Sequence, residues 1–211
     1  MKVLVFGATG MVGQGVLREC LLHPRVTAVT IVVRTPTGQT HAKLTELVHP
    51  DFTDWAGASL EADACFWCLG VSSTGMTEDA YTTITHDYAL TAAARMHHDR
   101  MTFVFVSGAG AEGKAMWARV KKRTEDDLAK LPWKRFYVFR PSVIRPLHGI
   151  RSRTRMYNLL YPLLYPVILV MRVVTPKSVT TTERVGRAMI ALADHGGGET
   201  ILGNPQINQT V

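Results

Sequence analysis

The chain has 211 residues and a net charge of +7, with 46% hydrophobic and 19% charged residues. These values are typical of a globular protein with one domain and a sizeable core, and they argue against a disordered chain. The positive charge favours anionic partners, but the basic residues fall in separate groups without a nucleic-acid motif or interleaved aromatic residues. Nucleic-acid binding is therefore not expected.

The start of the chain is a predicted core strand over residues 2–6, which leaves no room for a signal peptide. The chain has three cysteines, an odd number, and no secretory signal accompanies them. This combination predicts a reducing compartment, and a cytoplasmic location is expected.

Three glycines, Gly7, Gly10 and Gly13, lie between this strand and a helix predicted over 12–22. Gly7 permits a tight turn, Gly10 lets the backbone approach a phosphate, and Gly13 lets the helix pack on the strand. The unpaired N–H groups of the helix then point at one place, where the pyrophosphate of a nucleotide cofactor binds. The predicted cofactor-binding residues of this turn are Gly7, Thr9, Gly10, Met11, Val12 and Gly13. The alternative is a tight strand-to-helix turn without a ligand.

Apolar runs alternate with helical patterns along most of the chain. Buried strands are predicted at residues 2–6, 27–33, 65–69, 103–107 and 136–139, with a further short apolar run at 44–48. Helices are predicted between them at 12–22, 78–97 and 114–131. This alternation predicts an α/β fold with a doubly wound parallel sheet, the Rossmann fold.

The predicted domain is a single unit over residues 1–211, in which residues 1–146 form the Rossmann core. Residues 147–211 depart from the alternation and contain a predicted helix at 182–193 and a predicted strand at 199–202. Late segments of doubly wound folds usually build the substrate side, so this small C-terminal region is expected there.

Arg34 follows the second predicted strand directly. In this fold an acidic residue at that point binds the 2′-OH of the adenosine ribose, whereas an arginine suits a 2′-phosphate. Arg34 therefore favours NADP(H) over NAD(H), unless it is a solvated arginine at a strand end. Asp51 follows the run at 44–48, where its carboxylate is a candidate acceptor from the adenine amine; alternatively, Asp51 caps a helix near Trp55.

Cys65 and Cys68 have the C-x-x-C spacing of thioredoxin-like redox sites. Such a site needs a helix N-terminus to lower the pKa of a thiol. Here both cysteines lie in a predicted strand, where positions three apart face opposite sides of the sheet. Buried, inert thiols are therefore favoured. No metal site is predicted.

The glycine turn and several later segments resemble the short-chain dehydrogenase/reductase superfamily, and in particular the atypical branch with the Tat-interacting-protein oxidoreductase-like family. The shared features are the three glycines, Cys68-Leu69-Gly70, Asp87-Tyr88, Val120-Lys121 with Glu125, and Phe139-Arg140-Pro141. The resemblance covers roughly residues 1 to 146 and implies the fold and a nicotinamide cofactor, with Leu69 and Gly70 in a loop over it.

The resemblance also implies catalytic residues. Members of the superfamily reduce carbonyls with a tyrosine acid, a lysine four residues later and a serine from the preceding strand end. Lys121 matches the lysine and is expected to bind the nicotinamide ribose, because a spacing of four puts two side chains on one helical face. Ser107 is the candidate serine, followed by Gly108 where the family often has a second serine. Trp117 occupies the tyrosine position, and an indole N–H is no proton acid near neutral pH.

Two alternatives stay open at this site. Lys121 also fits a solvated helix face with Arg119, Lys122 and Arg123. Other residues that carry a proton are candidates to replace the missing acid, namely Tyr81, His86, Tyr88 and His148. For His86 and Tyr88, packing or solvent contact on a helix face is favoured.

Residues 156–171 form the most apolar stretch, with arginines before and after it. It contains Pro162 and Pro166, and it is shorter than the roughly 20 residues of a spanning helix, so crossing a membrane is not expected. A buried helix pair or a subunit contact in a homodimer is favoured. The alternative is a peripheral membrane contact through residues 151–177, because aromatic and basic residues suit the headgroup region.

Two functions follow from these observations. The first is an NADP(H)-dependent oxidoreductase-like enzyme that reduces an apolar carbonyl substrate. The second is a non-catalytic NADP(H)-binding sensor or partner-binding protein, which the tryptophan at position 117 motivates. The fold alone does not decide between them.

Overall fold

A computed structural model describes residues 1–55, 60–96, 98–150 and 179–211. The apolar stretch at 156–171 and the proposed membrane contact at 151–177 lie outside these described residues. Within the described part of the chain, no helix combines the length and the apolar character needed to cross a bilayer.

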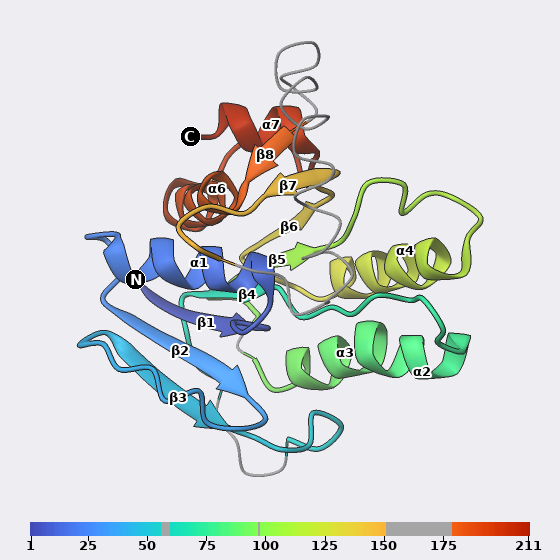
Figure 1. Cartoon of the computed structure of the whole chain (residues 1–211), viewed down its shortest axis with the longest axis horizontal. Coiled ribbons are helices and arrows are strands. Elements are labelled where there is room, and N and C mark those ends of the chain that lie inside the picture. The colour runs from blue at the N-terminus through green and yellow to red at the C-terminus, as the bar shows by residue number, and fades with distance from the viewer. Residues whose placement is uncertain (56–59, 97, 151–178) are drawn as a thin grey trace.

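In the described residues, seven parallel strands form one central sheet in the order β3-β2-β1-β4-β5-β6-β9 (Figure 1). The strands are β1 (Lys2–Phe6), β2 (Ala28–Val33), β3 (Leu44–Val48), β4 (Ala64–Trp67), β5 (Thr102–Val106), β6 (Arg135–Phe139) and β9 (Ile201–Leu202). Their β-branched and aromatic residues suit a sheet that is covered on both faces. The chain order reverses between β1 and β4, which is the switch point where doubly wound sheets bind ligands.

Helices cover both faces of the sheet (Figure 1). One face carries α1 (Met11–Leu22) and α6 (Thr182–His195). The other carries α2 (Glu78–Thr82), the π-helix η1 (Thr83–Asp87), α3 (Tyr88–Ala93) and α4 (Met116–Ala129). Each face has its own cluster of buried apolar side chains. The predicted doubly wound α/β fold is therefore confirmed.

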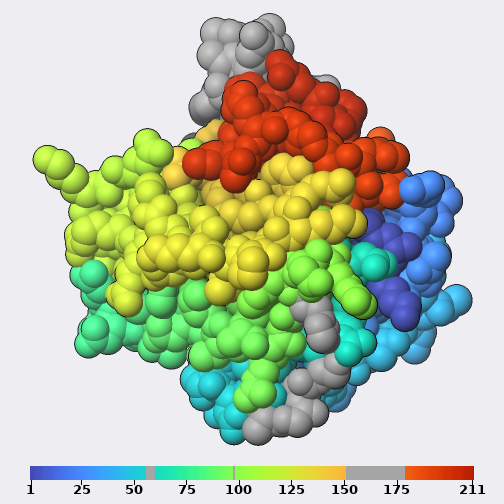
Figure 2. Space-filling view, turned by 180° about the vertical axis from the view of Figure 1, so that it is seen from behind, coloured from blue at the N-terminus to red at the C-terminus, as the bar shows by residue number. Residues whose placement is uncertain are grey.

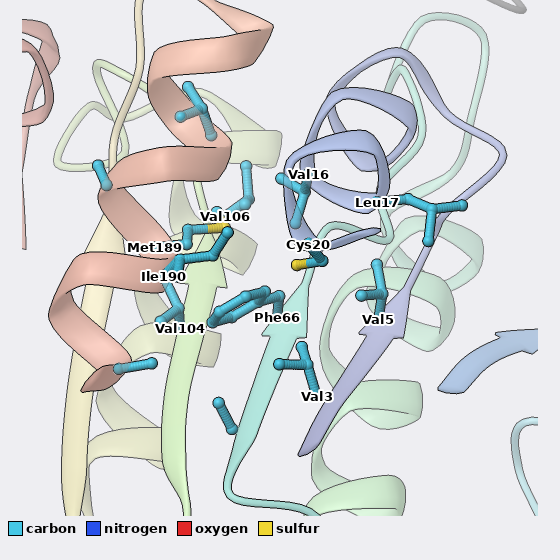
Figure 3. Close-up of a cluster of buried hydrophobic side chains, with 14 of the residues drawn as sticks. Val3, Val5, Val16, Leu17, Cys20, Phe66, Val104, Val106, Met189 and Ile190 are labelled. Atoms are coloured by element: carbon cyan, nitrogen blue, oxygen red, sulfur yellow. The ribbon is translucent and has the colours of Figure 1, made fainter. Parts of the chain in front are cut away.

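The contact between α1 and α6 is unusually close. A Cβ added at Gly15 of α1 would lie 2.5 Å from Cβ of Thr182, and one added at Gly186 of α6 would lie 2.9 Å from Cβ of Glu19. Small residues at these positions therefore let the two helices pack together above β1, β4 and β5. Figure 3 shows the buried side chains below them, including Val3, Val5, Val16, Leu17, Cys20, Phe66, Val104, Val106, Met189 and Ile190.

The C-terminal part of the chain closes the far edge of the sheet. Thr181 caps α6, because its hydroxyl accepts a hydrogen bond from the backbone N–H of Arg184 at 3.1 Å. After α6, β9 pairs with β6, and α7 (Asn204–Gln209) buries Ile207. Figure 2 shows these C-terminal residues in red, packed over the yellow segment around residue 140.

Most of the predicted elements lie within two residues of their observed bounds. The helix predicted over 78–97 is instead the series α2, η1 and α3, which ends at Ala93. The two-stranded sheet of β7 (Val143–Arg145) and β8 (Val179–Thr181) was not predicted, nor was α7. These short elements depend on partners distant in the chain, so local sequence patterns do not reveal them.

Candidate functional site

The turn between β1 and α1 is packed tightly against its own backbone. Gly7 has a φ of +73°, in the left-handed region that favours glycine. A Cβ at Gly13 would lie 2.1 Å from the carbonyl oxygen of Gly7, and a Cβ at Gly7 would lie 2.6 Å from the carbonyl carbon of Cys68. The turn after β1 and the loop after β4 therefore touch at the switch point of the sheet.

The start of α1 is available to an anion. Its first turn contains no acidic residue, and the N-cap Gly10 provides no side-chain hydrogen bond. The backbone N–H groups of Met11, Val12 and Gly13 precede the first intrahelical donor, since the N–H of Gln14 already bonds to Gly10. These groups and the positive end of the helix dipole suit a pyrophosphate.

A cavity of about 810 Å³ lies beside this turn. Predicted site residues in its wall are Gly7, Thr9, Arg34 and Leu69. Residues of α1 and of the segment after β2 complete much of the rest, including Gln14, Leu17, Arg18, Leu21, Thr35, Thr37, Gln39 and His41. The cavity therefore joins the glycine turn to the end of β2, as the adenosine half of a dinucleotide requires.

The charged side chains in the described cavity wall are positive. Arg18 and Arg34 line it, and no Asp or Glu is among the described residues that do so. The nearby carboxylate of Glu46 on β3 accepts hydrogen bonds from the backbone N–H of Thr37, at 3.1 Å, and from the Thr37 hydroxyl. Arg34 is exposed and forms no hydrogen bond or ion pair with any other described residue.

Asp51 does not line this cavity; its neighbour Phe52 does. The Asp51 carboxylate accepts hydrogen bonds from the backbone N–H and the hydroxyl of Thr53, at 2.8 and 2.6 Å. These bonds hold the pKa of the exposed Asp51 carboxyl below its usual range. Asp51 therefore caps a turn, and the helix expected near Trp55 is absent from the described residues 51–55.

Lys121 lies at the carboxyl edge of the sheet rather than on a solvated helix face. It is 8% exposed, and its Nζ donates a hydrogen bond to the carbonyl oxygen of Val106, at 3.0 Å. The same Nζ is 4.9 Å from the ring centroid of Phe105 and would be 3.8 Å from a Cβ at Gly70. Burial lowers the pKa of Lys121 to about 8, against the opposing attraction of Glu125. Burial therefore makes the Lys121 ammonium a stronger acid than an ordinary lysine.

Trp117 lies one turn before Lys121 on α4, and its ring covers the loop after β5. Atoms of its six-membered ring would be 3.7 Å from a Cβ at Gly108 and 3.5 Å from one at Gly110. Ser107, at the start of this loop, has a buried hydroxyl oxygen without a hydrogen-bond partner among the described residues. A buried unpaired hydroxyl is unusual and suits a ligand that brings its own polar atom.

The other candidate acids are engaged elsewhere. His86 lies between the carboxylates of Asp87 and Asp127, at 2.7 and 2.9 Å, and so joins η1 to α4. His148 contacts Glu183 on α6 at 2.8 Å. Tyr81 is buried on α2, which raises the pKa of its phenol. The ring of Tyr88 packs edge-on against Phe52, with centroids 5.7 Å apart. None of these described contacts involves Lys121.

The cysteine pair has the geometry of inert thiols. Cys65 belongs to the apolar cluster beneath α3 and α4, whereas Cys68 packs against the cluster beneath α1 and α6. Burial raises the pKa of both thiols, that of Cys68 to about 12. Neither thiol is therefore ionised near neutral pH, which supports the interpretation that they are not a redox site.

Several residues of the cavity were missed by the sequence analysis. Gln14 and Arg18 are four residues apart on α1, so their side chains lie on the same face of the helix, and this face lines the cavity. This helical spacing, counted from the glycine turn, was a usable signal. Ile150 also lines the cavity, but its position depends on the loop after β7, which no local pattern predicts.

Comparison with known proteins identifies relatives of this chain. No family model matches it. The Fmp52-1 protein of Aspergillus terreus is 32% identical over 166 residues, which are 73% of this chain and 70% of the relative. The Fmp52-1 protein of Aspergillus oryzae is 34% identical over 164 residues, covering 72% and 68% of the two chains. The finer resemblance to the Tat-interacting-protein oxidoreductase-like family is not confirmed.

These relatives are named as mitochondrial proteins. That finding contradicts the cytoplasmic location expected from the sequence, which was wrong. The number of cysteines bears only on the redox state of a compartment, and it does not distinguish one reducing compartment from another.

Solved structures of the short-chain dehydrogenase/reductase superfamily share the fold. An oxidoreductase of that family from Burkholderia thailandensis has a TM-score of 0.69 at 15% identity, over 100% of this chain and 93% of that one. A human epimerase family protein, solved with NADPH, has a TM-score of 0.67 at 14% identity, over 96% and 73%. The chain therefore belongs to the Fmp52 family and has the Rossmann fold of the short-chain dehydrogenases/reductases.

Proposed function

We propose that this protein binds NADP(H) and acts as an oxidoreductase-like member of the short-chain dehydrogenase/reductase superfamily. One observation carries the proposal: Gly7 and Thr9 of the glycine turn lie in the wall of the same cavity as Arg34, and no acidic residue is among its described lining. An NAD-specific cavity needs a carboxylate for the ribose 2′-OH, whereas an arginine suits the 2′-phosphate of NADP(H).

The residues present fit the cofactor. The N–H groups of Met11, Val12 and Gly13 would bind the pyrophosphate, and Arg34 would bind the 2′-phosphate. On the nicotinamide side, the Lys121 ammonium beside Gly70 would donate hydrogen bonds to the ribose. When bound, NADPH supplies a hydride.

The enzyme interpretation is supported by two polar groups near the end of β5. Lys121 and Ser107 are both there, one as a buried amine and the other with an unpaired hydroxyl. We expect the substrate to be an apolar carbonyl compound. Oxidation of NADPH, followed at 340 nm across aldehydes, ketones and quinones, tests this; no turnover with any of them would count against catalysis.

A second function is favoured by Trp117, which occupies the position of the superfamily's tyrosine acid. Its ring covers Gly108 and Gly110. In that case the protein binds NADP(H) without redox turnover, as a sensor or a partner-binding protein. Trp117→Tyr distinguishes the two. If the missing acid alone prevents turnover, the variant gains carbonyl reduction while its NADPH affinity changes less than twofold.

Cofactor binding itself is tested by calorimetric titration of the whole chain with NADPH and NADH. We expect NADPH to bind more tightly, and Arg34→Ala to weaken NADPH by roughly tenfold while NADH changes little, because a charge-assisted contact to phosphate is lost. Equal affinity of wild-type protein for the two cofactors would refute the NADP(H) preference, and no binding of either would refute the proposed function.

A further inference from the structure

A second arginine, Arg18, lines the cavity together with Arg34. It comes from α1, one turn beyond Gln14, whereas Arg34 comes from the end of β2. The two guanidinium groups therefore reach the same cavity from different elements. Leu17 and Leu21 of α1 form apolar wall beside Arg18, so the charged head is the main polar feature that this part of the helix offers.

Arg18 is held in place by a buried carboxylate. Its Nη1 lies 2.5 Å from Oε1 of Glu19, which is only 5% exposed. The other oxygen of Glu19 accepts a hydrogen bond from Nε of Arg187 on α6, at 3.1 Å. Arg187 is fixed in turn by Glu183, at 2.8 Å. Both oxygens of Glu19 are thus engaged, and the guanidinium of Arg18 is anchored at one edge.

An anchored guanidinium retains other donors. Arginine has five N–H donors in a planar fork, and the described contacts of Arg18 use the Nη1 end toward Glu19. Its side chain is 36% exposed, so the remaining donors are accessible from the cavity that it lines. Because the anchor already restricts the side chain, less conformational entropy is lost when an anion binds.

We propose that Arg18 is a second 2′-phosphate-binding residue and that it binds the phosphate together with Arg34. In this arrangement Glu19 positions the guanidinium of Arg18. This inference rests on the proposed function. A phosphate monoester carries a charge of about −1.5 to −2 near neutral pH, so one arginine neutralises only part of it. Arg18 and Arg34 line the same cavity, so their guanidinium groups offer N–H donors to the phosphate oxygens from two different elements.

Binding of adenosine fragments tests the inference without any need for turnover. We expect Arg18→Gln to weaken 2′,5′-ADP and NADPH by about tenfold, while 5′-AMP and NADH change less than twofold. Arg18→Lys keeps the charge but not the fork, so we expect an intermediate loss. Arg25→Gln is the control: it removes an arginine that pairs with Asp194 at 2.7 Å and is not in the cavity lining, and it should change none of the four affinities.

Glu19→Gln tests the anchor. We expect it to weaken 2′,5′-ADP by about threefold while 5′-AMP is unaffected, provided that thermal unfolding shows a folded variant. Unchanged 2′,5′-ADP affinity in Arg18→Gln would overturn the inference and leave the proposed function standing, as would an equal loss for 2′,5′-ADP and 5′-AMP. Failure of the wild-type protein to bind either dinucleotide would instead overturn the proposed function.

Discussion

Lys121 carries an ionisable amine in a buried position, which is energetically unfavourable for the charged form. Its amine is enclosed beneath α4, where it hydrogen-bonds to a single carbonyl oxygen, that of Val106. A buried ammonium is costly to desolvate, which is why its pKa falls to about 8 from 10.5. A structural residue in this position would be apolar, so the retained charge supports a role toward a ligand.

Replacing Lys121 with methionine should stabilise the protein at neutral pH. The unfolded chain keeps the ordinary lysine pKa and so binds the proton more strongly between about pH 8 and pH 10.5. Wild-type stability therefore rises with pH across that interval. We expect Lys121→Met to raise the free energy of unfolding by about 1–3 kcal/mol at pH 7, and this gain to shrink toward pH 10.5.

Urea denaturation at several pH values measures this effect. Lys122→Met is the matched control, because the Lys122 side chain is 41% exposed and pairs with Asp126 on the same helix. Its effect should stay below about 1 kcal/mol. A gain for Lys121→Met that does not vary between pH 7 and pH 10.5 would show that the amine is not the cause.

The glycines of the turn make separable contributions. A Cβ at Gly13 would lie 2.1 Å from the carbonyl oxygen of Gly7, a clash that the backbone must relieve. A Cβ at Gly10 would be 3.3 Å from the same atom, and the φ of Gly10 is −81°, which alanine adopts freely. We expect Gly13→Ala to destabilise the fold by more than about 2 kcal/mol. Gly10→Ala should remain folded but lose NADPH affinity.

Thermal unfolding and NADPH titration of the two variants check this difference. Equal stability of Gly13→Ala and wild type would contradict the packing described for the turn. Retained NADPH affinity in a folded Gly10→Ala would show that the phosphates do not approach the backbone there.

The sequence revealed much of this site because its strongest signals are local. The glycine turn, Arg34 and Lys121 each have a short, specific context. Arg18 gave no such signal, since its relevance depends on the segment after β2 lying opposite α1 in space. The absence of Asp51 from the cavity lining has a similar cause. Asp51 and Phe52 are neighbours in the chain, and only the path of the backbone decides which of them faces the cavity.

At the scale of elements, α4 is fixed to β6 by a buried ion pair. Arg140, at the end of β6, contacts both oxygens of Glu125 on α4, at 3.2 and 2.6 Å. Glu125 is 3% exposed and lies one turn after Lys121. Arg140 also contacts Glu112 in the loop before α4, which lowers the pKa of the Glu112 carboxyl. This pair therefore sets the position of the helix that carries Lys121 and Trp117.

Arg140→Met should destabilise the protein by about 3–5 kcal/mol, because it leaves the Glu125 carboxylate buried without its partner. Adding Glu125→Leu to that variant should recover most of the loss, since the uncompensated charge is then gone. Chemical denaturation of both variants provides the test. A double variant as unstable as the single one would show that packing, and not charge, holds α4 to β6.

The bounds of a helix or strand were predictable where its own residues show a clear hydrophobic periodicity. Long apolar strands and the amphipathic α4 and α6 carry strong periodicity. The π-helix η1 interrupts a pattern that looks continuously helical, because one turn widens where His86 joins α4. The pairing of β7 with β8 joins residues 143–145 to 179–181, and a pairing over that distance leaves no mark in either segment.

For the molecule as a whole, the sheet depends on its last strand. The edge of β6 is covered by β9 through the pairs Val138–Ile201 and Phe139–Leu202. Removing residues 201–211 would uncover that edge together with the apolar surface beneath α7. We expect the truncated chain to aggregate, as light scattering coupled to size exclusion would show. Removing Val211 alone, which is exposed, should change nothing; a monodisperse truncated chain would contradict the expectation.

The same pairing has a consequence for the order in which the protein is made. A ribosome completes β6 long before it adds residues 201–202, so the nascent chain carries an open sheet edge throughout the synthesis of the intervening residues. Helix α6 is likewise synthesised long after α1, the helix against which it packs. Newly made chains should therefore be a substrate for chaperones that shield strand edges until the C-terminal segment arrives.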